Sequence, residues 1–313
     1  MALNRIAVLV GGVGGAKLAH GLAQHLAPGQ LTVIVNTGDD FWHYGLKICP
    51  DLDTVMYTLA GWVDKANGWG VAGDTTAMLD SLRRYGEMPW FRLGDQDVAT
   101  HLLRTQAIRS GETLTQITQQ LTKRAGILHA ILPMTDAEMP TMIDTVEYGE
   151  IEFQEYFVRY RWQPTVKAIR SAGEAAARPS QAVERAICEA DAILFAPSNP
   201  WLSIAPILRV PGMADLLRSR PVPRVAISPI VEGKALKGPA AKIMAELGYA
   251  EVSAREVAAY YQGMATGFVY DQRDAGQPVH IESIRAVQMD TVMKNESDRA
   301  AFAGRILEWI ETG

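Results

Sequence analysis

The feature that most constrains the fold is a short apolar run that ends in a cluster of glycines near the N-terminus. Residues 5–22 read RIAVLVGGVGGAKLAHGL, in which four of the five positions from 11 to 15 are glycine and a helix-compatible pattern follows. A second apolar run, LTVIVN, occupies positions 31–36. A buried strand, a glycine turn, a helix and another buried strand make a βαβ unit with two parallel strands.

Further apolar runs alternate with helical patterns along the rest of the chain. We expect strands at 129–134, 191–197, 224–231 and 267–271, whose continuous apolar residues are typical of a sheet covered on both faces. We expect helices at 54–65, 75–85, 99–126, 181–189, 239–247 and 298–310. This alternation predicts an α/β fold with a doubly wound, mostly parallel, Rossmann-like sheet.

One stretch interrupts the alternation. Residues 141–161 read TMIDTVEYGEIEFQEYFVRYR, in which polar residues alternate with β-branched or aromatic ones around Gly149. That pattern predicts an antiparallel β-hairpin. We therefore expect a nucleotide-binding core made of residues 1–135 and 183–313, with a small inserted subdomain at 136–182.

The overall composition excludes several classes of protein. The chain has 313 residues, a net charge of −5 and a pI of about 5.7, whereas nucleic-acid-binding proteins usually carry a basic face. Cys49 and Cys188 are far apart in sequence, as expected for reduced thiols in a cytoplasmic protein. The N-terminal apolar run is too short for a signal peptide or a membrane span, so we expect no membrane partner. The acidic net charge likewise leads us to expect no nucleic-acid partner.

The glycine cluster matches neither familiar phosphate-binding motif. A dinucleotide fingerprint that begins at Gly12 would need a third glycine where Lys17 stands, and a Walker A loop would need Ser or Thr where Leu18 stands. The physical basis of both motifs is nevertheless present, because glycines let an anion approach the backbone and a helix N-terminus attracts it. We expect an anion to bind at Gly11, Gly12, Gly14, Gly15 and Lys17; the alternative is a tight strand-to-helix turn with a surface lysine.

Four carboxylates follow the second predicted strand. The block NTGDDFWHYGLKICPDLDT at 36–54 contains Asp39, Asp40, Asp51 and Asp53. Such a group suits a divalent cation or the orientation of a substrate's hydroxyls. The alternatives are turn chemistry for Asp39 and Asp40 and a helix N-cap for Asp53.

Three other motifs contain polar residues near predicted helix starts or strand ends. Asp74 or Thr75 is expected to cap one helix and Asp97 another, and Arg92 can pair with an anion or lie along the surface. The APSNPWL motif places Ser198 and Asn199 at the carboxyl end of a strand, where they can contact a nucleotide or form a stiff turn. The histidines show no spacing typical of a zinc site.

Taken in order, these motifs resemble the 2-phospho-lactate transferases of coenzyme F420 biosynthesis. The resemblance extends from about residue 5 to residue 270, and the NTGDD…PDLDT block is its most specific part. The matching stretches include LVGGVGGAKLAHGL, WGVAGDTTAMLDSL, WFRLGDQDVATHLLRT, APSNPWLSIAPIL and SPIVEGKALKGPAAKIMAELG.

The resemblance implies a magnesium-assisted transfer of a substituted phosphate group. In that family the donor is a guanosine diphosphate ester of lactate or enolpyruvate, and the acceptor is the terminal ribityl hydroxyl of the deazaflavin FO. GMP leaves, and F420-0 or its dehydro form is the product. Which three-carbon acid is transferred stays open, and a homodimer is expected for such a fold.

The resemblance also assigns roles to individual residues. It implies that Asp53 and Arg92 contact FO, and that the glycine loop, Lys17, Ser198 and Asn199 contact the donor. Asp53 and Asp40 are the expected catalytic residues, and Asp40 and Asp51 the expected Mg²⁺ ligands. Two other hypotheses remain: a nucleotide-sugar-binding regulator of the gluconeogenesis-factor type, and an NAD(P)-dependent oxidoreductase.

Overall fold

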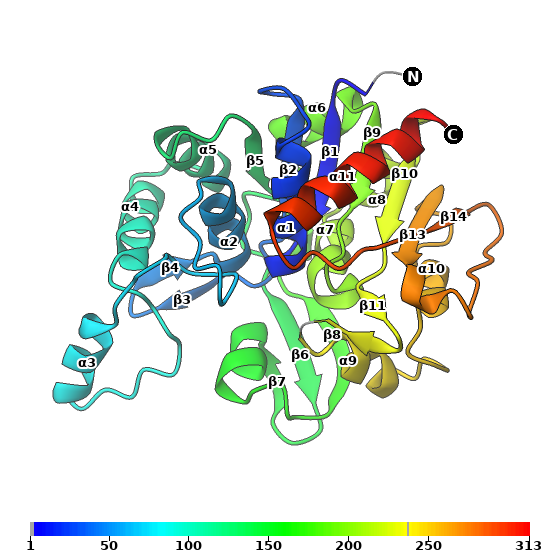
Figure 1. Ribbon diagram of the computed structural model, residues 1–313. Helices are drawn as coiled ribbons and strands as arrows, with labels where there is room; N and C mark the ends of the chain where they lie inside the picture. The colour runs from blue at the N-terminus through cyan, green and yellow to red at the C-terminus, as the bar shows by residue number, and fades with distance from the viewer. Residues whose placement is uncertain (1–2, 237) are drawn as a thin grey trace.

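A computed structural model describes residues 3–236 and 238–313; Lys237, within the SPIVEGKALKGP stretch, lies outside the described residues. Its centre is a seven-stranded sheet in the order β14-β13-β10-β9-β1-β2-β5, and every neighbouring pair is parallel (Figure 1). This is the Rossmann order with one strand added, so the predicted α/β fold is confirmed. The strands are β1 (Ile6–Val10), β2 (Leu31–Val35), β5 (Ala130–Pro133), β9 (Ala192–Phe195), β10 (Arg224–Ile227), β13 (Gly267–Asp271) and β14 (Arg285–Met289).

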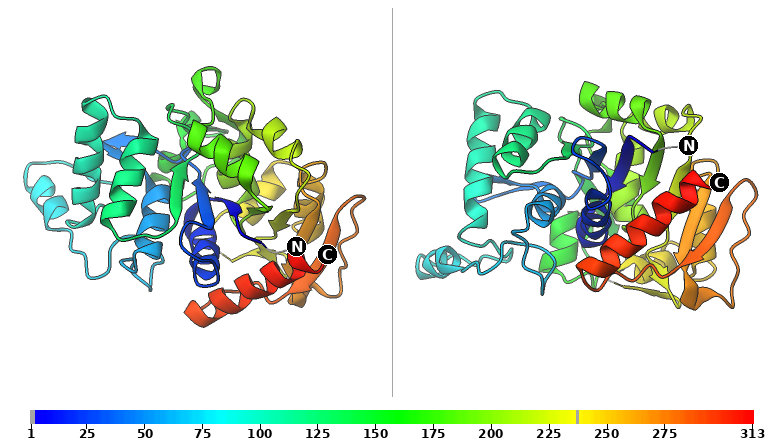
Figure 2. Two further views of the ribbon diagram at one scale, coloured as in Figure 1. Left: turned by 90° about the horizontal axis from the view of Figure 1, so that it is seen from above. Right: turned by 45° about the horizontal axis from the view of Figure 1, so that its top comes forward.

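Helices cover both faces of this sheet. Ile6, Val8 and Val10 of β1 face α1 (Gly12–Ala23), α2 (Pro50–Leu59) and α11 (Glu296–Glu311), whereas Ala7 and Leu9 face the opposite layer. That layer contains α6 (Gln181–Glu189), α7 (Ala205–Arg209), α8 (Met213–Arg218) and α10 (Ala254–Tyr260). Figure 2 shows the green helix α6 and the red helix α11 on opposite sides of the sheet. Because successive side chains of β1 point to opposite faces of the sheet, this strand contributes to two separate hydrophobic cores, one on each face.

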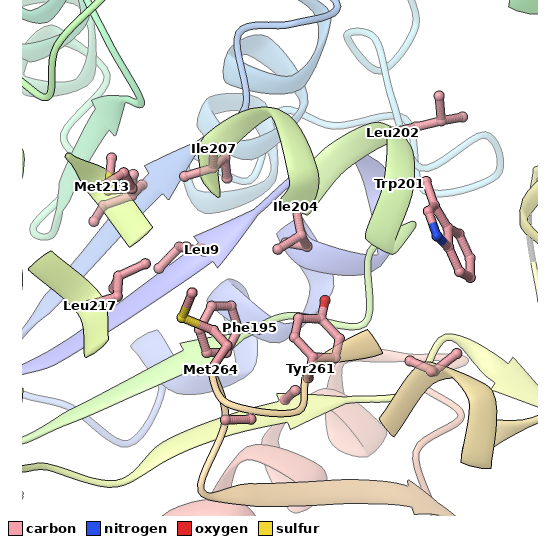
Figure 3. Close-up of a cluster of buried hydrophobic side chains, with 14 of the residues drawn as sticks. Leu9, Phe195, Trp201, Leu202, Ile204, Ile207, Met213, Leu217, Tyr261 and Met264 are labelled. Carbon is pink, nitrogen blue, oxygen red and sulfur yellow. The ribbon is translucent and has the colours of Figure 1, made fainter. Parts of the chain in front are cut away.

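The second core is dense in large apolar side chains. Figure 3 shows Leu9 and Phe195 of the sheet in one cluster with Ile207, Met213 and Leu217 of the covering helices. All five side chains have no measurable exposure to solvent. Burial of such side chains stabilises a fold by about 1.5–3 kcal/mol each, so this layer holds the covering helices firmly on β1 and β9.

The predicted hairpin is present, but its second strand is shorter than expected. β6 (Thr141–Thr145) pairs antiparallel with β7 (Gly149–Glu152) and with β8 (Val166–Ser171). The chain then forms a short π-helix, η1 (Glu155–Arg159), instead of continuing as a strand. Phe153 and Phe157 stack with ring centroids 5.3 Å apart, and a spacing of four residues brings side chains together on a helical turn, not on a strand.

The boundaries of an inserted subdomain at 136–182 stay a prediction. The buried side chains Ile143 and Phe153 of this region belong to one continuous apolar cluster with Phe195 of the main sheet. Among the described residues, no helix has both the length and the apolar character needed to cross a membrane.

Other predicted elements differ in detail. The helix expected at 99–126 is two helices, α4 (Asp97–Arg109) and α5 (Leu114–Arg124), because Gly111 adopts φ 88° and Thr113 starts a new helix with a capping box. The strand expected at 224–231 ends at Ile227, and Ile230–Val231 form a separate strand, β11, paired with β12 (Lys234–Ala235). Strand β14 and helices α8 and α10 were not predicted. The remaining helix, α9, covers Ala240–Glu246.

An arm projects from the β2 side of the molecule. It contains β3 (Phe41–His43), β4 (Leu46–Ile48) and α3 (Ala77–Arg84), and Figure 1 shows α3 well away from the main sheet. A small apolar cluster of its own, which includes Phe41, Ile48, Leu79 and Leu93, packs the arm together.

The helix caps of the arm correct the sequence prediction. The Asp95 carboxylate accepts hydrogen bonds from the backbone N–H groups of Ala77 and Met78, both at 2.9 Å, and so caps α3. Asp74 accepts from the backbone N–H groups at 96 and 97, at 2.8 and 3.0 Å, and so caps α4. Asp74, which precedes α3 in the sequence, therefore caps α4, and Asp95, which precedes α4, caps α3. Asp97 lies in the first turn of α4 and is not the N-cap that we expected.

Candidate functional site

A cavity of about 720 Å³ opens at the carboxyl ends of the central strands, where the strand order reverses between β1 and β9. That is the usual ligand site of doubly wound sheets. Its walls come from the glycine loop, the start of α2, the arm, the insertion and a late segment, residues 290–294, which we call the strap. Lining residues include Gly11, Gly12, Gly14, Lys17, Asp39, Asp51, Asp53, Trp69, Arg92, Asp97, His101, Phe157, Ser198, Asn199 and Lys294.

The glycine loop is held by the loop that follows β9. The Gly11 N–H donates to Ser198 Oγ at 3.1 Å, and that hydroxyl donates to the Gly11 carbonyl at 2.6 Å. A Cβ on Gly14 would lie 2.5 Å from the Pro197 carbonyl oxygen, and one on Gly15 would lie 2.7 Å from Val10 Cβ. Close packing therefore requires glycine at both positions; Gly15 itself is buried and does not line the cavity.

Position 12 requires glycine because of its backbone conformation. Its φ is 61°, in the left-handed region, while a Cβ there would meet only Asp51 Oδ1, at 3.6 Å. Lys17, one turn further along α1, extends to the strap and donates from Nζ to the Met293 carbonyl at 2.7 Å. The loop and the strap thus meet over the cavity.

The side-chain oxygen of Asn199 caps the helix that follows it. Its Oδ1 accepts from the N–H groups of Trp201 and Leu202 at 3.0 and 3.2 Å and so begins the π-helix η3 (Pro200–Ile204). Ser198 and Asn199 both line the cavity, yet the oxygen of each is already bonded to the backbone. The free Asn199 Nδ2, which is buried and has no partner in the described structure, is the group left for a ligand.

Two carboxylates lie together beside the glycine loop. Asn36 Nδ2 donates to Asp39 Oδ1 at 2.9 Å and to Asp51 Oδ2 at 3.0 Å, and both side chains are buried. Burial, reinforced by the charge of Asp51, raises the pKa of Asp39 well above its ordinary value, and burial raises the pKa of Asp51 to about 6. Neither carboxylate forms an ion pair with any described residue. The pair therefore favours a proton or a bound cation.

Asp40 is a third buried carboxylate, next to Asp39 in the sequence. It does not line the cavity, and burial raises its pKa to about 7 despite the opposing attraction of the Lys47 ammonium. Lys47 in turn donates to Glu138 at 3.1 Å. The expected roles of Asp40 in catalysis and metal binding stay predictions.

A second group of charged side chains surrounds Asp53. Arg104 of α4 binds both carboxylate oxygens, through Nη2 to Oδ1 and through Nη1 to Oδ2, the latter at 3.1 Å. Burial would lower the pKa of Arg104, but the Asp53 charge raises it above its ordinary value. Asp53 therefore belongs to a buried, bidentate ion pair and is not the N-cap that the sequence offered as an alternative.

His101 connects this ion pair to Asp97. Its Nδ1 lies 3.6 Å from Asp53 Oδ2, and its Nε2 lies 3.3 Å from Asp97 Oδ2. The Tyr57 hydroxyl donates to Asp97 Oδ1 at 2.6 Å. Burial would raise the pKa of Asp97, but the close approach of His101 and the hydrogen bond from Tyr57 hold it below its ordinary value. Asp53, Asp97 and His101 offer three ligand atoms within 4.8 Å of one another, although Arg104 already balances Asp53.

The arm supplies the far wall of the cavity. The Arg92 guanidinium lies over the Trp69 ring, 5.8 Å from its centroid, and both side chains are exposed along the wall. The structure thus brings Arg92 and the predicted acids Asp51 and Asp53 to one cavity. Sequence reasoning missed Tyr57, His101 and Arg104, although the spacing of His101 and Arg104 on one helical face was a usable signal.

Comparison with known proteins identifies the family. The family model described as 2-phospho-L-lactate transferase CofD matches residues 6–305. The chain belongs to the CofD family. It is therefore an enzyme, a transferase of substituted phosphate groups, and the CofD match includes every lining residue described above.

Curated relatives agree over nearly the full length. The CofD chain is 41% identical to a phosphoenolpyruvate transferase of Streptomyces griseus, with 98% of each chain covered. It is 41% identical to a phosphoenolpyruvate transferase of Thermobifida fusca, with 97% of each covered, and 38% identical to one of Mycolicibacterium smegmatis, with 95% and 96% covered. Among solved structures, a UPF0052 family protein of Bacillus halodurans shares the fold, with a TM-score of 0.61, 14% identity and 98% and 99% coverage.

Proposed function

We propose that this enzyme transfers a phosphoenolpyruvyl group from a guanosine diphosphate-linked donor to the ribityl hydroxyl of FO, and releases GMP and dehydro-F420-0. The curated relatives, which are named phosphoenolpyruvate transferases, favour enolpyruvate over lactate as the transferred acid. The observation that carries the proposal is one cavity with two kinds of wall. An anion-binding loop and lysine line part of it, and Asp53, Arg92 and Trp69 also line it.

The donor side suits a nucleotide diphosphate. Gly12 and Gly14 expose backbone at the N-terminus of α1, where N–H groups and the helix dipole attract phosphate. Lys17 fixes its charge at the same place through its bond to Met293. The unpartnered Asn199 Nδ2 provides a further donor for the guanosine or its phosphate. Charge that develops on the departing GMP is stabilised by such preorganised donors.

Mg²⁺ is the metal that the family implies, and the residues present suit it. The best site is the pair Asp39 and Asp51, because two buried carboxylates with no ion pair need a compensating charge. The cluster of Asp53, Asp97 and His101 suits it less, because Arg104 already neutralises Asp53. When bound, the metal would neutralise charge on the diphosphate. Asp40 with Asp51 is the other pair to be tested.

The acceptor side suits a hydroxylated ring system. The exposed Trp69 ring, with Arg92 above it, offers a surface for the deazaflavin. Asp53, held in one orientation by Arg104, can accept a hydrogen bond from the ribityl hydroxyl and aim its oxygen at phosphorus. The new O–P bond forms as the P–O bond to GMP breaks, and the hydroxyl proton leaves through Asp53 towards solvent or product.

The decisive experiment combines the purified protein with FO, Mg²⁺ and, separately, the enolpyruvyl and lactyl donors. Mass spectrometry of the product and quantification of GMP follow. We expect dehydro-F420-0 with equimolar GMP from the enolpyruvyl donor. GMP release without modification of FO would refute transfer, and a preference for the lactyl donor would refute the assignment of the acid.

The gluconeogenesis-factor alternative requires binding without transfer. A thermal-shift assay separates the two, because stabilisation by uridine diphosphate sugars and not by GDP or FO would favour the alternative. Failure to bind NAD(P) would dismiss the oxidoreductase hypothesis. We also propose that the protein is a homodimer and that it is cytoplasmic. Light scattering in solution tests the homodimer.

A further inference from the structure

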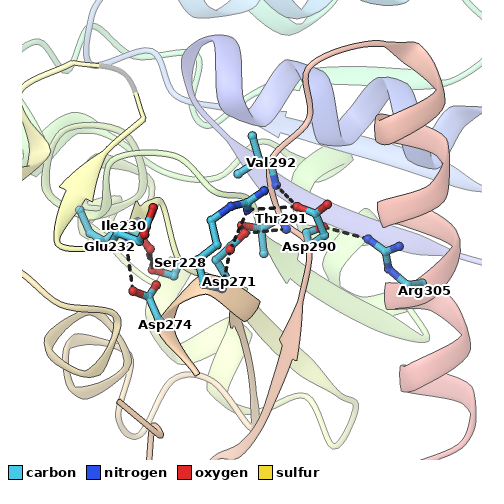
Figure 4. Close-up of polar contacts among 10 residues, drawn as sticks. Ser228, Ile230, Glu232, Asp271, Asp274, Asp290, Thr291, Val292 and Arg305 are labelled. Atoms are coloured by element: carbon cyan, nitrogen blue, oxygen red, sulfur yellow. Dashed lines mark hydrogen bonds and ion pairs between the residues drawn. The ribbon is translucent and has the colours of Figure 1, made fainter. Parts of the chain in front are cut away.

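The strap is held in place by a buried carboxylate at the end of β13. Asp271 is completely buried, and its Oδ2 accepts from the Thr291 backbone N–H at 2.9 Å and from the Thr291 hydroxyl at 2.8 Å (Figure 4). Burial would raise the pKa of Asp271, but these bonds and those from Arg273 lower it. The carboxylate is therefore a fixed anchor for the first half of the strap.

The residue before Thr291 is held from two further directions. Arg273 Nη1 lies 3.2 Å from Asp290 Oδ1, and Arg305 of α11 donates to the Asp290 carbonyl at 2.9 Å (Figure 4). At the other end, Met293 accepts the bond from Lys17. Strand β13, helix α11 and the glycine-loop helix thus hold the strap at residues 291, 290 and 293, respectively.

Lys294 is the last residue of this fixed segment. It lines the cavity, its side chain is exposed, and it forms no ion pair within the described residues. The nearby Glu296 does not neutralise it, because Glu296 pairs with Lys65 at 2.9 Å. Lys294 thus adds an uncompensated positive charge beside the carbonyl that already holds Lys17.

We propose that Lys294 binds the diphosphate of the guanosine-linked donor, so that the strap and the glycine loop grip the same anion from opposite sides. The proposal rests on the proposed function, but it concerns nucleotide binding and can fail separately. Its basis is geometric: Lys17 and Met293 bring the strap against α1, and the next residue carries a free ammonium on the cavity wall. Lysine is a common point-charge partner of phosphate.

The experiment measures GDP affinity of the full chain by calorimetry, and the KM for the donor, in Lys294→Ala, Lys294→Arg and Lys123→Ala. Lys123→Ala is the control, because it removes an exposed lysine of α5 that neither lines the cavity nor pairs with Glu296. We expect Lys294→Ala to weaken GDP binding roughly five- to tenfold, the usual range for one partly exposed charged contact. Arg should restore most of the affinity, and Lys123→Ala should match the wild type.

Salt dependence distinguishes a phosphate contact from a change of structure. GDP affinity of the wild type should fall more steeply with ionic strength than that of Lys294→Ala, because one charge–charge contact is screened in the former only. Equal slopes, unchanged GDP affinity, or an effect on the donor KM with none on GDP would each overturn the proposal. If wild type binds GDP but does not modify FO, the proposed function fails while the role of Lys294 is still decided by the binding data.

Discussion

Gly14→Ala should separate the function of the glycine loop from its contribution to stability. The added Cβ would lie 2.5 Å from the Pro197 carbonyl oxygen, whereas such contacts essentially never fall below 3.0 Å. The start of α1 and the loop after β9 must therefore move apart by at least about 0.5 Å. That movement acts on the two loops that are locked together through Ser198.

The expected cost to stability is modest. Overpacking of this kind costs about 1–3 kcal/mol. A chain of 313 residues has an unfolding entropy of about 0.7 kcal/mol/K, so the Tm should fall by roughly 2–5 °C. The cost to activity should be larger, because displacements near 1 Å reduce turnover by up to about 100-fold. We expect kcat/KM for the donor to fall about 10- to 100-fold.

Two glycine variants serve as controls in calorimetry with GDP, thermal unfolding and donor kinetics. Gly12→Ala has room for its Cβ but a φ of 61°, so strain of about 1 kcal/mol is its main cost and its loss of affinity should be smaller. Gly29→Ala has φ 81° and open space, and should show the strain without any loss of activity. Wild-type GDP affinity in Gly14→Ala, or a greater loss in Gly12→Ala, would refute this reasoning.

Three further variants test the acids. Asp53→Asn should abolish transfer and also lower stability by about 3–5 kcal/mol, because Arg104 loses its buried counter-charge; GDP binding measured below the melting temperature checks that the loss is catalytic. The ordinary pKa of 3.8 for Asp51 rises to about 6 on folding, so its contribution to stability is lost as pH rises from about 4 to about 6, and Mg²⁺ should restore more stability at pH 8 than at pH 5. Asp39→Asn should stabilise the metal-free protein at pH 8 and remove this Mg²⁺ response in thermal unfolding; a full response would exclude it as a ligand. Asp40→Asn should keep both the response and most of kcat, and loss of both would favour the Asp40–Asp51 pair.

The sequence predicted the central sheet well because its strands are buried on both faces. Runs such as IAVLV and LTVIV leave few alternatives to a parallel strand in a covered sheet. The glycine loop was predictable for a similar reason, since four close glycines have few structural uses. Strand β14, RAVQM, was not predicted, because at a sheet edge its apolar run is short and mixed.

The polar contacts were less predictable because their partners are distant in sequence. Arg104 and Asp53 are 51 residues apart, and nothing local marks either as the partner of the other. The helix caps were misassigned because a local rule pairs an acid with the helix that follows it in sequence. In the arm, Asp74 caps α4 instead of α3, and Asp95, which was not predicted as a cap, caps α3. The strap has no periodic pattern, and its role arises only when β13 and α11 hold it beside α1.

The bond between Lys17 and the Met293 carbonyl has a consequence for how the enzyme comes into being. Its two partners are 276 residues apart, so one is made near the beginning of translation and the other near the end. Domains commonly begin to fold while the ribosome is still at work, yet contacts of this sequence separation form late. The first βαβ unit emerges early, with the glycine loop and Lys17 but without the strap that carries Lys294. We therefore expect a nascent or truncated chain to bind nucleotides more weakly than the full chain, because the strap belongs to the last tenth of the polypeptide.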